Sequence, residues 1–119
     1  MNVTGVAFIM YPVSDMERAA RFYSDVVGLR KSGLESDFWV EFDVDGTTFG
    51  IGNFEQVGAV GSAGSLSLEV ADMTAARSAL SAAGVETFEP FETQICFISG
   101  FSDPDGNRVW LHQAKSQAA

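Results

Sequence analysis

The sequence predicts an α+β fold in which two copies of one βαβββ module form a curved mixed sheet around a cleft. Two repeated motifs, or echoes, indicate the duplication. The motif Val13-Ser14-Asp15-Met16 is similar to Val70-Ala71-Asp72-Met73, and Asp45-Gly46-Thr47 is similar to Asp105-Gly106-Asn107. Both echoes are separated by close to half of the 119 residues. Self-similarity at a fixed offset indicates one supersecondary unit used twice, and two units are too few for a solenoid. We therefore expect the halves to pack face to face.

The first module, at about residues 3–53, begins with the apolar, β-rich run Val3–Tyr11, which predicts a strand. Ser14 or Asp15 then caps a helix that runs to about Val27, because a serine or aspartate oxygen accepts hydrogen bonds from the free amides of the first turn. Apolar residues at helical spacing predict one buried stripe on this helix. The stripe consists of Met16, Ala19, Ala20, Phe22, Tyr23 and Val26.

Three further strands complete this module, and Asp45-Gly46 between the last two is a strong signal for a hairpin turn. The predicted strands are Gly28–Leu34, Phe38–Val44 and Thr47–Gly52. A segment without a clear hydrophobic period, rich in glycine, alanine and valine, follows at about residues 54–64. We interpret this segment as the linker between the modules and as a candidate flap over the cleft.

The second module, at about residues 65–113, repeats the order of the first. Asp103-Pro104-Asp105-Gly106 forms the turn before its last strand, where its carboxylates cap local amides. Residues Ala114 to Ala119 are expected to be frayed. The predicted elements are the strand Ser65–Val70, the helix Asp72–Ala83, and the strands Val85–Phe88, Ile95–Phe101 and Asn107–Gln113.

Length and composition favour a single domain over residues 1–119, with 46% hydrophobic residues available for a core. The net charge of −9 repels phosphate backbones, so nucleic-acid binding is not expected. The acidity either attracts cationic ligands or only maintains solubility. No apolar run reaches the length of a membrane span, and Arg18 is the first basic residue. Together with the lone Cys96, these features predict a cytoplasmic protein that contacts no membrane.

Several motifs together resemble the vicinal oxygen chelate superfamily, which includes glyoxalase I, extradiol dioxygenases and the fosfomycin- and bleomycin-resistance proteins. These motifs are the duplicated βαβββ order, Phe22-Tyr23 within the first helix, Gly28-Leu29 after it, and the closing Asp103-Pro104-Asp105-Gly106-Asn107. The resemblance covers Val3 to His112. It implies the fold more strongly than any one function, because the superfamily hosts many chemistries. It also implies a homodimer, because two chains often complete the paired sheets.

In metal-dependent members of this superfamily, His, Glu or Gln ligands come from the first and last strands of each module. The corresponding positions here carry Phe8, Gly50, Ser65 and Trp110. None of these side chains commonly binds a divalent metal, and a shift of one residue offers no better ligand. We therefore expect neither a metal nor another cofactor. Ordinary glyoxalase I and dioxygenase activities are not expected either.

Strand alternation assigns the remaining side chains to two faces. One face is uniformly apolar and should pack on the helices; it carries Ile9, Tyr11, Leu66, Leu68, Val70, Val109 and Leu111. The opposite face should line the cleft with aromatic walls and a few polar groups, as in small-molecule sites. The ligand-binding residues predicted there are Phe8, Met10, Trp39, Glu41, Ser67, Glu69, Trp110 and His112.

Four functions are compatible with this cleft, and the sequence assigns no catalytic residue. The first is metal-independent binding of a small aromatic or apolar ligand, as in resistance proteins that sequester a compound, and a cationic ligand would suit the carboxylates. The second is a metal-free isomerase or lyase that uses Glu41, Glu69 or His112 as its acid–base group. The third is a metal-dependent lyase or dioxygenase with displaced ligands at the same three residues. The fourth is a structural or regulatory partner whose own side chains fill the cleft.

Overall fold

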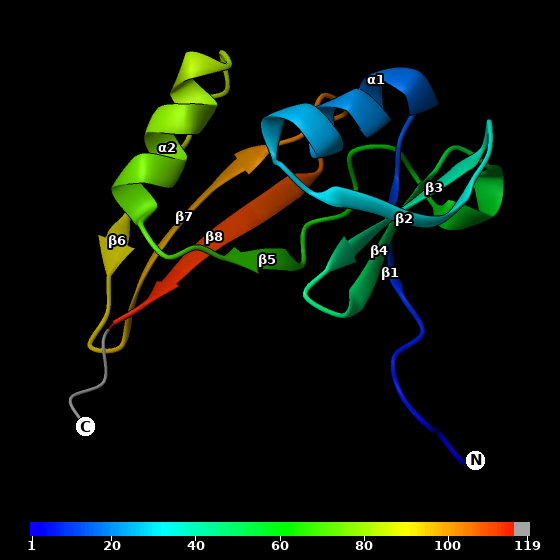
Figure 1. Cartoon of the computed structure of the whole chain (residues 1–119), viewed down its shortest axis with the longest axis horizontal. Helices are drawn as coiled ribbons and strands as arrows, with labels where there is room; N and C mark the ends of the chain where they lie inside the picture. The colour runs from blue at the N-terminus through cyan, green and yellow to red at the C-terminus, as the bar shows by residue number, and fades with distance from the viewer. Residues whose placement is uncertain (116–119) are drawn as a thin grey trace.

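The computed structural model describes residues 1–115, and its two modules have the same order of elements (Figure 1). The first module consists of β1 (Ile9–Pro12), α1 (Met16–Arg21) with its π-helical continuation η1 (Phe22–Val26), β2 (Arg30–Glu35), β3 (Trp39–Val44) and β4 (Thr47–Gly52). A 3-10 turn, η2 (Glu55–Val57), lies in the linker. The second module consists of β5 (Leu66–Glu69), α2 (Met73–Ala82), β6 (Phe91–Glu92), β7 (Cys96–Ser102) and β8 (Arg108–Ala114).

The strands pair in the same way in both modules, which confirms the predicted duplication. One sheet has the order β1-β4-β3-β2 and the other has the order β5-β8-β7-β6. The first strand of each module pairs in parallel with the last, and the other pairs are antiparallel. The hydrogen bonds therefore form two four-stranded mixed sheets, where the sequence led us to expect one curved sheet.

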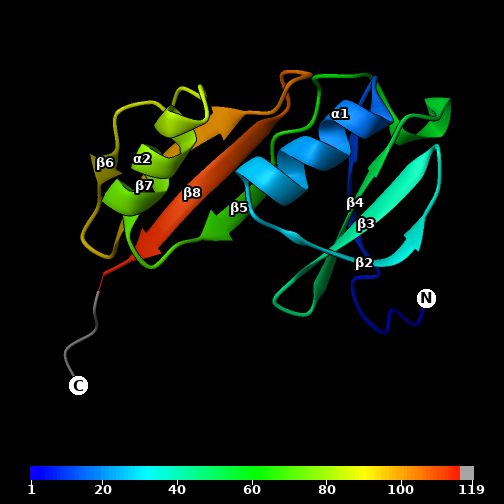
Figure 2. The ribbon, with the colours of Figure 1, turned by 45° about the horizontal axis from the view of Figure 1, so that its top comes forward.

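Both helices lie on the same side of the strands, as two views of the ribbon agree (Figures 1 and 2). The molecule is a flat plate with principal extents of 43 × 41 × 23 Å. Its radius of gyration is 15.0 Å, whereas a compact chain of this length would have about 13.5 Å. The core lies between helices and sheets, and its largest fully buried side chains include Tyr11, Tyr23, Phe42, Phe49 and Phe101. Among residues 1–115, no helix covers the opposite face of either sheet (Figures 1 and 2).

Aspartates begin both helices, as the repeated motif predicts. The Asp15 carboxylate accepts a hydrogen bond from the Arg18 amide at 3.0 Å, and Asp72 accepts one from the Ala75 amide at 3.1 Å. Each such cap stabilises a helix by about 1 kcal/mol. No helix among residues 1–115 has the length and apolar character needed to cross a bilayer.

Most predicted elements are shifted by one or two residues at their ends, and three differences go beyond such shifts or bear on the expected frayed end. The first strand begins at Ile9, where its pairing with Phe49 of β4 begins, and residues 1–8 belong to no strand. The strand predicted at Val85–Phe88 is absent, and the short β6 pairs with β7 in its place. Ala114 ends β8, so it is not frayed, whereas residues 116–119 of the expected frayed end lie outside the described part.

A buried polar network joins the two modules on the helix side. The Tyr23 hydroxyl donates to Asp103 Oδ2 at 2.7 Å, and the Asn107 amide donates to the Pro12 carbonyl at 2.7 Å and to Asp103 Oδ2 at 2.9 Å. The Tyr11 hydroxyl donates to the carbonyl of the first residue of β8. Burial and then the charge of Asp103 hold the pKa of the Tyr23 phenol far above its ordinary value. Because these partners come from distant segments, the network fixes how the modules sit against each other.

Candidate functional site

Seven of the eight predicted ligand-binding residues lie in strands, on the sheet faces turned away from the helices, and Phe8 precedes β1 and contacts Trp39. The strand registers require this placement, since their neighbours along each strand, such as Tyr11, Phe42, Leu68 and Leu111, are buried in the core. We call the first four the first half-site; they are Phe8, Met10, Trp39 and Glu41. We call the others the second half-site; they are Ser67, Glu69, Trp110 and His112.

Trp39 is the centre of the first half-site. Its ring meets Phe8 edge to face at a centroid distance of 5.3 Å, and Phe54 lies 6.1 Å away on the other side. The indole Nε1 donates to Glu41 Oε1 at 2.9 Å. The ring covers Gly50, where a Cβ atom would come within 2.3 Å of it. Glycine at this position therefore allows the tryptophan to lie flat across β4 while remaining partly exposed.

Trp110 has the corresponding place in the second half-site. Phe88 meets its ring edge to face at 5.7 Å, and Phe91 stacks on Phe88 at 6.4 Å. The Trp110 Nε1 donates to the Gly64 carbonyl at 2.6 Å. Gly100 lies opposite Trp110 on β7, and a Cβ there would come within 2.9 Å of the Phe88 ring. Both modules thus contain a glycine beside a tryptophan whose indole nitrogen donates a hydrogen bond.

Glu69 and His112 form a pair beside Trp110. The Nδ1 atom of His112 lies 2.5 Å from Glu69 Oε1, and the Ala114 amide donates to Glu69 Oε2 at 2.8 Å. The Ala114 hydrogen bond and then the His112 hydrogen bond lower the pKa of Glu69. The carboxylate therefore orients the imidazole, which is a geometry suited to proton transfer.

The donor set does not fit a metal ion. The positions at which the superfamily places its ligands carry Phe8, Gly50, Ser65 and Trp110. The alternative ligands Glu41, Glu69 and His112 are divided between the two sheets, and Glu41 already accepts from an indole. Within residues 1–115 no three His, Cys, Asp or Glu side chains gather in a cluster able to hold an ion.

The sequence analysis did not identify Phe54, Phe88 and Arg108, which surround the two tryptophans. The Arg108 guanidinium lies 5.4 Å from the Phe88 ring centroid and 5.9 Å from that of Trp110. Strand alternation could have found this arginine, because it precedes Trp110 by two residues on the same strand. Phe54 and Phe88 lie outside strands, where alternation gives no signal.

The chain alone does not bring the two half-sites together. No aromatic contact or hydrogen bond among residues 1–115 joins a side chain of one half-site to a side chain of the other. The modules instead meet through the buried network and through the contact of Phe22 with Phe101 at 6.0 Å, which belongs to the core.

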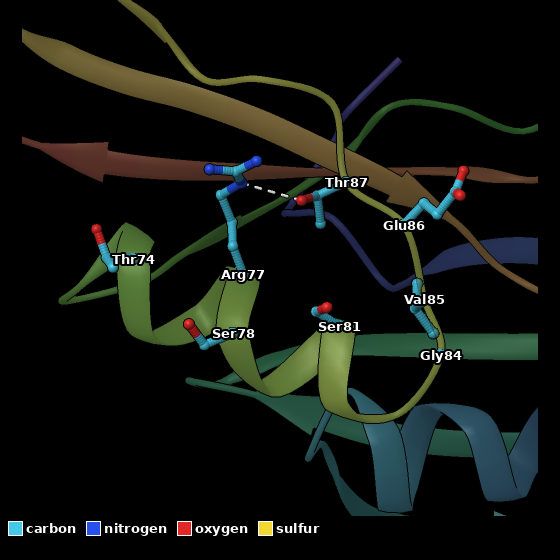
Figure 3. Close-up of a pocket in the computed structure, with 8 residues that line it drawn as sticks. All are labelled: Thr74, Arg77, Ser78, Ser81, Gly84, Val85, Glu86 and Thr87. Carbon is cyan, nitrogen blue, oxygen red and sulfur yellow. Dashed lines mark hydrogen bonds between the residues drawn. The ribbon is translucent and has the colours of Figure 1, made fainter.

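A groove of about 690 Å³ between α2 and the segment 84–87 contains none of these residues (Figure 3). Figure 3 shows Arg77 reaching from the helix toward Thr87, to which its Nε donates at 3.0 Å. Its guanidinium also pairs with Glu89 at 3.6 Å. Because the single cation of this groove is already engaged, we do not assign the groove a ligand.

Fold and site together define a class of protein: two βαβββ modules that present aromatic residues on open sheet faces. The chain belongs to the Glyoxalase/Bleomycin resistance protein/Dioxygenase superfamily, whose family model matches residues 5–111. The resemblance found in the sequence is therefore confirmed. No curated protein matches the chain.

Solved structures extend this comparison. The chain is similar to TnmS3, an antibiotic binding protein from Streptomyces sp. CB03234, with 30% identity, a TM-score of 0.83 and coverage of 97% of this chain and 99% of that one. A glyoxalase/bleomycin resistance protein from the same organism has 31% identity and a TM-score of 0.77, with coverage of 92% and 100%. A superfamily member from Sphaerobacter thermophilus has 27% identity and a TM-score of 0.79, with coverage of 93% and 98%.

Proposed function

We propose that this protein binds a small, flat aromatic molecule between its open sheet faces, without a metal ion and without transforming it. The observation that carries the proposal is the pair of partly exposed tryptophans, each held in place by a hydrogen bond and by ring contacts. Aromatic rings fixed in this way supply large apolar contact area at little further cost in side-chain entropy. The similarity to an antibiotic-binding protein supports the same function.

The proposal includes a homodimer that completes the site. The plate is only 23 Å thick, and large apolar side chains remain exposed, including Phe8 at 45%, Met10 at 38% and Phe91 at 50%. Exposed apolar patches of this kind mark interaction surfaces. A second copy would cover these faces and could set one half-site opposite the other, which would enclose a ligand on two sides.

Binding of 9-anthracenemethanol, a neutral fluorescent probe, tests this function. Trp39→Ala and Trp110→Ala should each weaken binding about tenfold or more, since each removes a stacking surface. Ile95→Ala, which removes an exposed apolar side chain from the turn before β7, is the matched control. Equal affinity in all four proteins would contradict the assignment. Light scattering should give the mass of two chains, and a stoichiometric metal in the protein as isolated would contradict metal independence.

The Glu69–His112 pair favours a second candidate function, a metal-free isomerase or lyase. Its carboxylate holds the imidazole by the Nδ1 atom, which leaves the other ring nitrogen to exchange a proton with a bound substrate. The two functions differ in what happens to a bound compound. Recovery of an unchanged ligand after prolonged incubation supports sequestration, whereas a product whose formation stops in His112→Gln supports catalysis.

A further inference from the structure

The lysine and arginine side chains of this acidic protein are paired with carboxylates, with one exception among residues 1–115. Of the seven Lys and Arg residues, all of which lie within residues 1–115, six form ion pairs with carboxylates. Among residues 1–115, Arg108 forms no ion pair and its guanidinium donates no hydrogen bond, although the chain contains 16 Asp and Glu residues. An arginine carries five donors in a planar fork, so Arg108 has the capacity to bind a further partner.

The position of Arg108 places it in the proposed ligand site. Strand register puts its side chain on the same face of β8 as Trp110, where the rings of Phe88 and Trp110 hold the guanidinium by cation–π contact. Arg108, Phe88 and Gly100 also line a groove of about 730 Å³ that reaches the core residues Phe22 and Phe101 and includes the carboxylates of Glu86 and Asp103. A ligand that packs on Trp110 would therefore lie beside a fixed positive charge.

The carboxylates of the two half-sites are already engaged. Glu41 accepts from the Trp39 indole, and Glu69 accepts from the Ala114 amide and contacts His112. The net charge of −9 suggests an attraction for cationic ligands. Because these two carboxylates already have partners, that attraction is weakened where the ligand would bind. Arg108 is therefore the cation at the site that no described carboxylate engages, and Glu86, which lines the same groove, is a carboxylate without an ion pair among residues 1–115.

We propose, building on the function proposed above, that Arg108 binds an anionic group of the ligand. The ligand class is then a flat aromatic acid: a ring system for the tryptophans that carries a carboxylate or a similar oxyanion for the guanidinium. A guanidinium and a carboxylate can form two parallel hydrogen bonds, which orients the ring system as well as attracting it. Partial exposure of Arg108 keeps the gain moderate, because solvent screens the pair.

Three probes with the same ring system separate charge from stacking: 9-anthracenecarboxylate, 9-anthracenemethanol and 9-(aminomethyl)anthracene. In the natural protein the carboxylate should bind about five to ten times more tightly than the alcohol, which corresponds to a partly screened charge-assisted contact. The aminomethyl probe should bind most weakly. Arg108→Gln should abolish the preference for the carboxylate, and Arg108→Lys should keep part of it. Arg21→Gln removes the same charge from the surface of α1 and is the matched control.

The outcomes distinguish this inference from the function on which it rests. Loss of the carboxylate preference in Arg108→Gln but not in Arg21→Gln, with an unchanged near-UV circular dichroism spectrum, supports it. Equal binding of all three probes, or a preference for the aminomethyl probe, overturns the role of Arg108 and leaves the aromatic site intact. Failure of all three probes to bind contradicts the proposed function and this inference together. If Arg108→Gln does not fold, the preference should still fall as salt is raised in the natural protein, and a salt-independent preference overturns the inference.

Discussion

The two turns that share the Asp-x-Asp-Gly pattern have the same local chemistry and different surroundings. In the first module, Asp43 accepts from the Gly46 amide at 3.1 Å and pairs with Arg30 at 3.2 Å. Its side chain remains 31% exposed. In the second module, Asp103 accepts from the Asp105 and Asn107 amides and is only 4% exposed. One turn lies at the rim of a sheet, and the other is buried between the modules.

The difference shows that the duplicated sequence specifies the conformation of the turn. Residues outside the turn determine how deeply it is buried and which side chains hydrogen-bond to it. Asp103 is buried because Tyr23 donates to it and because Asn107 links it to the Pro12 carbonyl. The open faces differ in the same manner. Each presents a tryptophan beside a glycine, but one tryptophan donates to a glutamate and the other lies beside an unpaired arginine.

Removing the two aspartates should give the largest contrast. Asp103→Ala leaves the buried Tyr23 hydroxyl and two backbone amides without an acceptor, so the free energy of unfolding should fall by about 3–4 kcal/mol. Asp43→Ala removes a partly exposed ion pair and one turn bond and should cost about 1 kcal/mol or less. Urea unfolding of both variants measures the difference. Equal losses would mean that the buried network does not hold the modules together.

Adding a methyl group to the two glycines should give a smaller contrast. At Gly100 a Cβ would lie 2.8 Å from the Val109 carbonyl oxygen, which belongs to the backbone of the neighbouring strand. At Gly50 the three nearest atoms would all belong to the partly exposed Trp39 side chain rather than to the backbone. Gly100→Ala should therefore cost about 2–3 kcal/mol, and Gly50→Ala about 1 kcal/mol, with a shifted tryptophan emission spectrum. An unchanged spectrum in Gly50→Ala would contradict the placement of Trp39.

Alkaline titration should detect the buried network through Tyr23. Its pKa is raised in the folded protein, so above the ordinary value of 10.0 the unfolded chain releases a proton that the folded chain keeps. Stability is therefore fully present below pH 10.0 and falls above it, by about 1.4 kcal/mol per pH unit for each such tyrosine. Tyr23→Phe removes one titrating group, so it should reduce this slope by about 1.4 kcal/mol per pH unit. This holds whatever the stability of the variant is at neutral pH. Identical slopes in both proteins would show that the phenol ionises freely in the folded state.

Much of the fold could be predicted because the signals were local. Asp15 and Asp72 cap the helices as expected, and the strand Thr47–Gly52 has the predicted bounds, since a hairpin turn precedes it. Alternation placed Trp39 and Trp110 on the open faces, because the period of a strand leaves a side chain only two directions. The duplicated modules followed from the repeated motifs.

The remaining features depend on contacts that no local pattern encodes. Val85–Phe88 has strand-forming residues, yet Phe88 packs its ring beside Gly100 and Trp110, and pairing with β7 begins only at Phe91. The ion-pair partners of the basic residues are also set by the fold, so the lack of a partner at Arg108 is visible only in the structure. For the same reason the sequence could not show that the two half-sites lie apart within one chain.

The smallest expected effect concerns Glu69. Its pKa is lowered from 4.5 in the folded protein, so the carboxylate contributes stability above pH 4.5 that is lost as the pH falls through its folded pKa. The Ala114 amide is the largest cause and His112 the second. His112→Gln should therefore raise the pKa of Glu69 only part of the way toward 4.5, as followed by the NMR signal of its side-chain carboxyl carbon. A complete return to 4.5 would mean that the imidazole, and not the strand backbone, holds this carboxylate, which would strengthen the case for an acid–base pair at the second half-site.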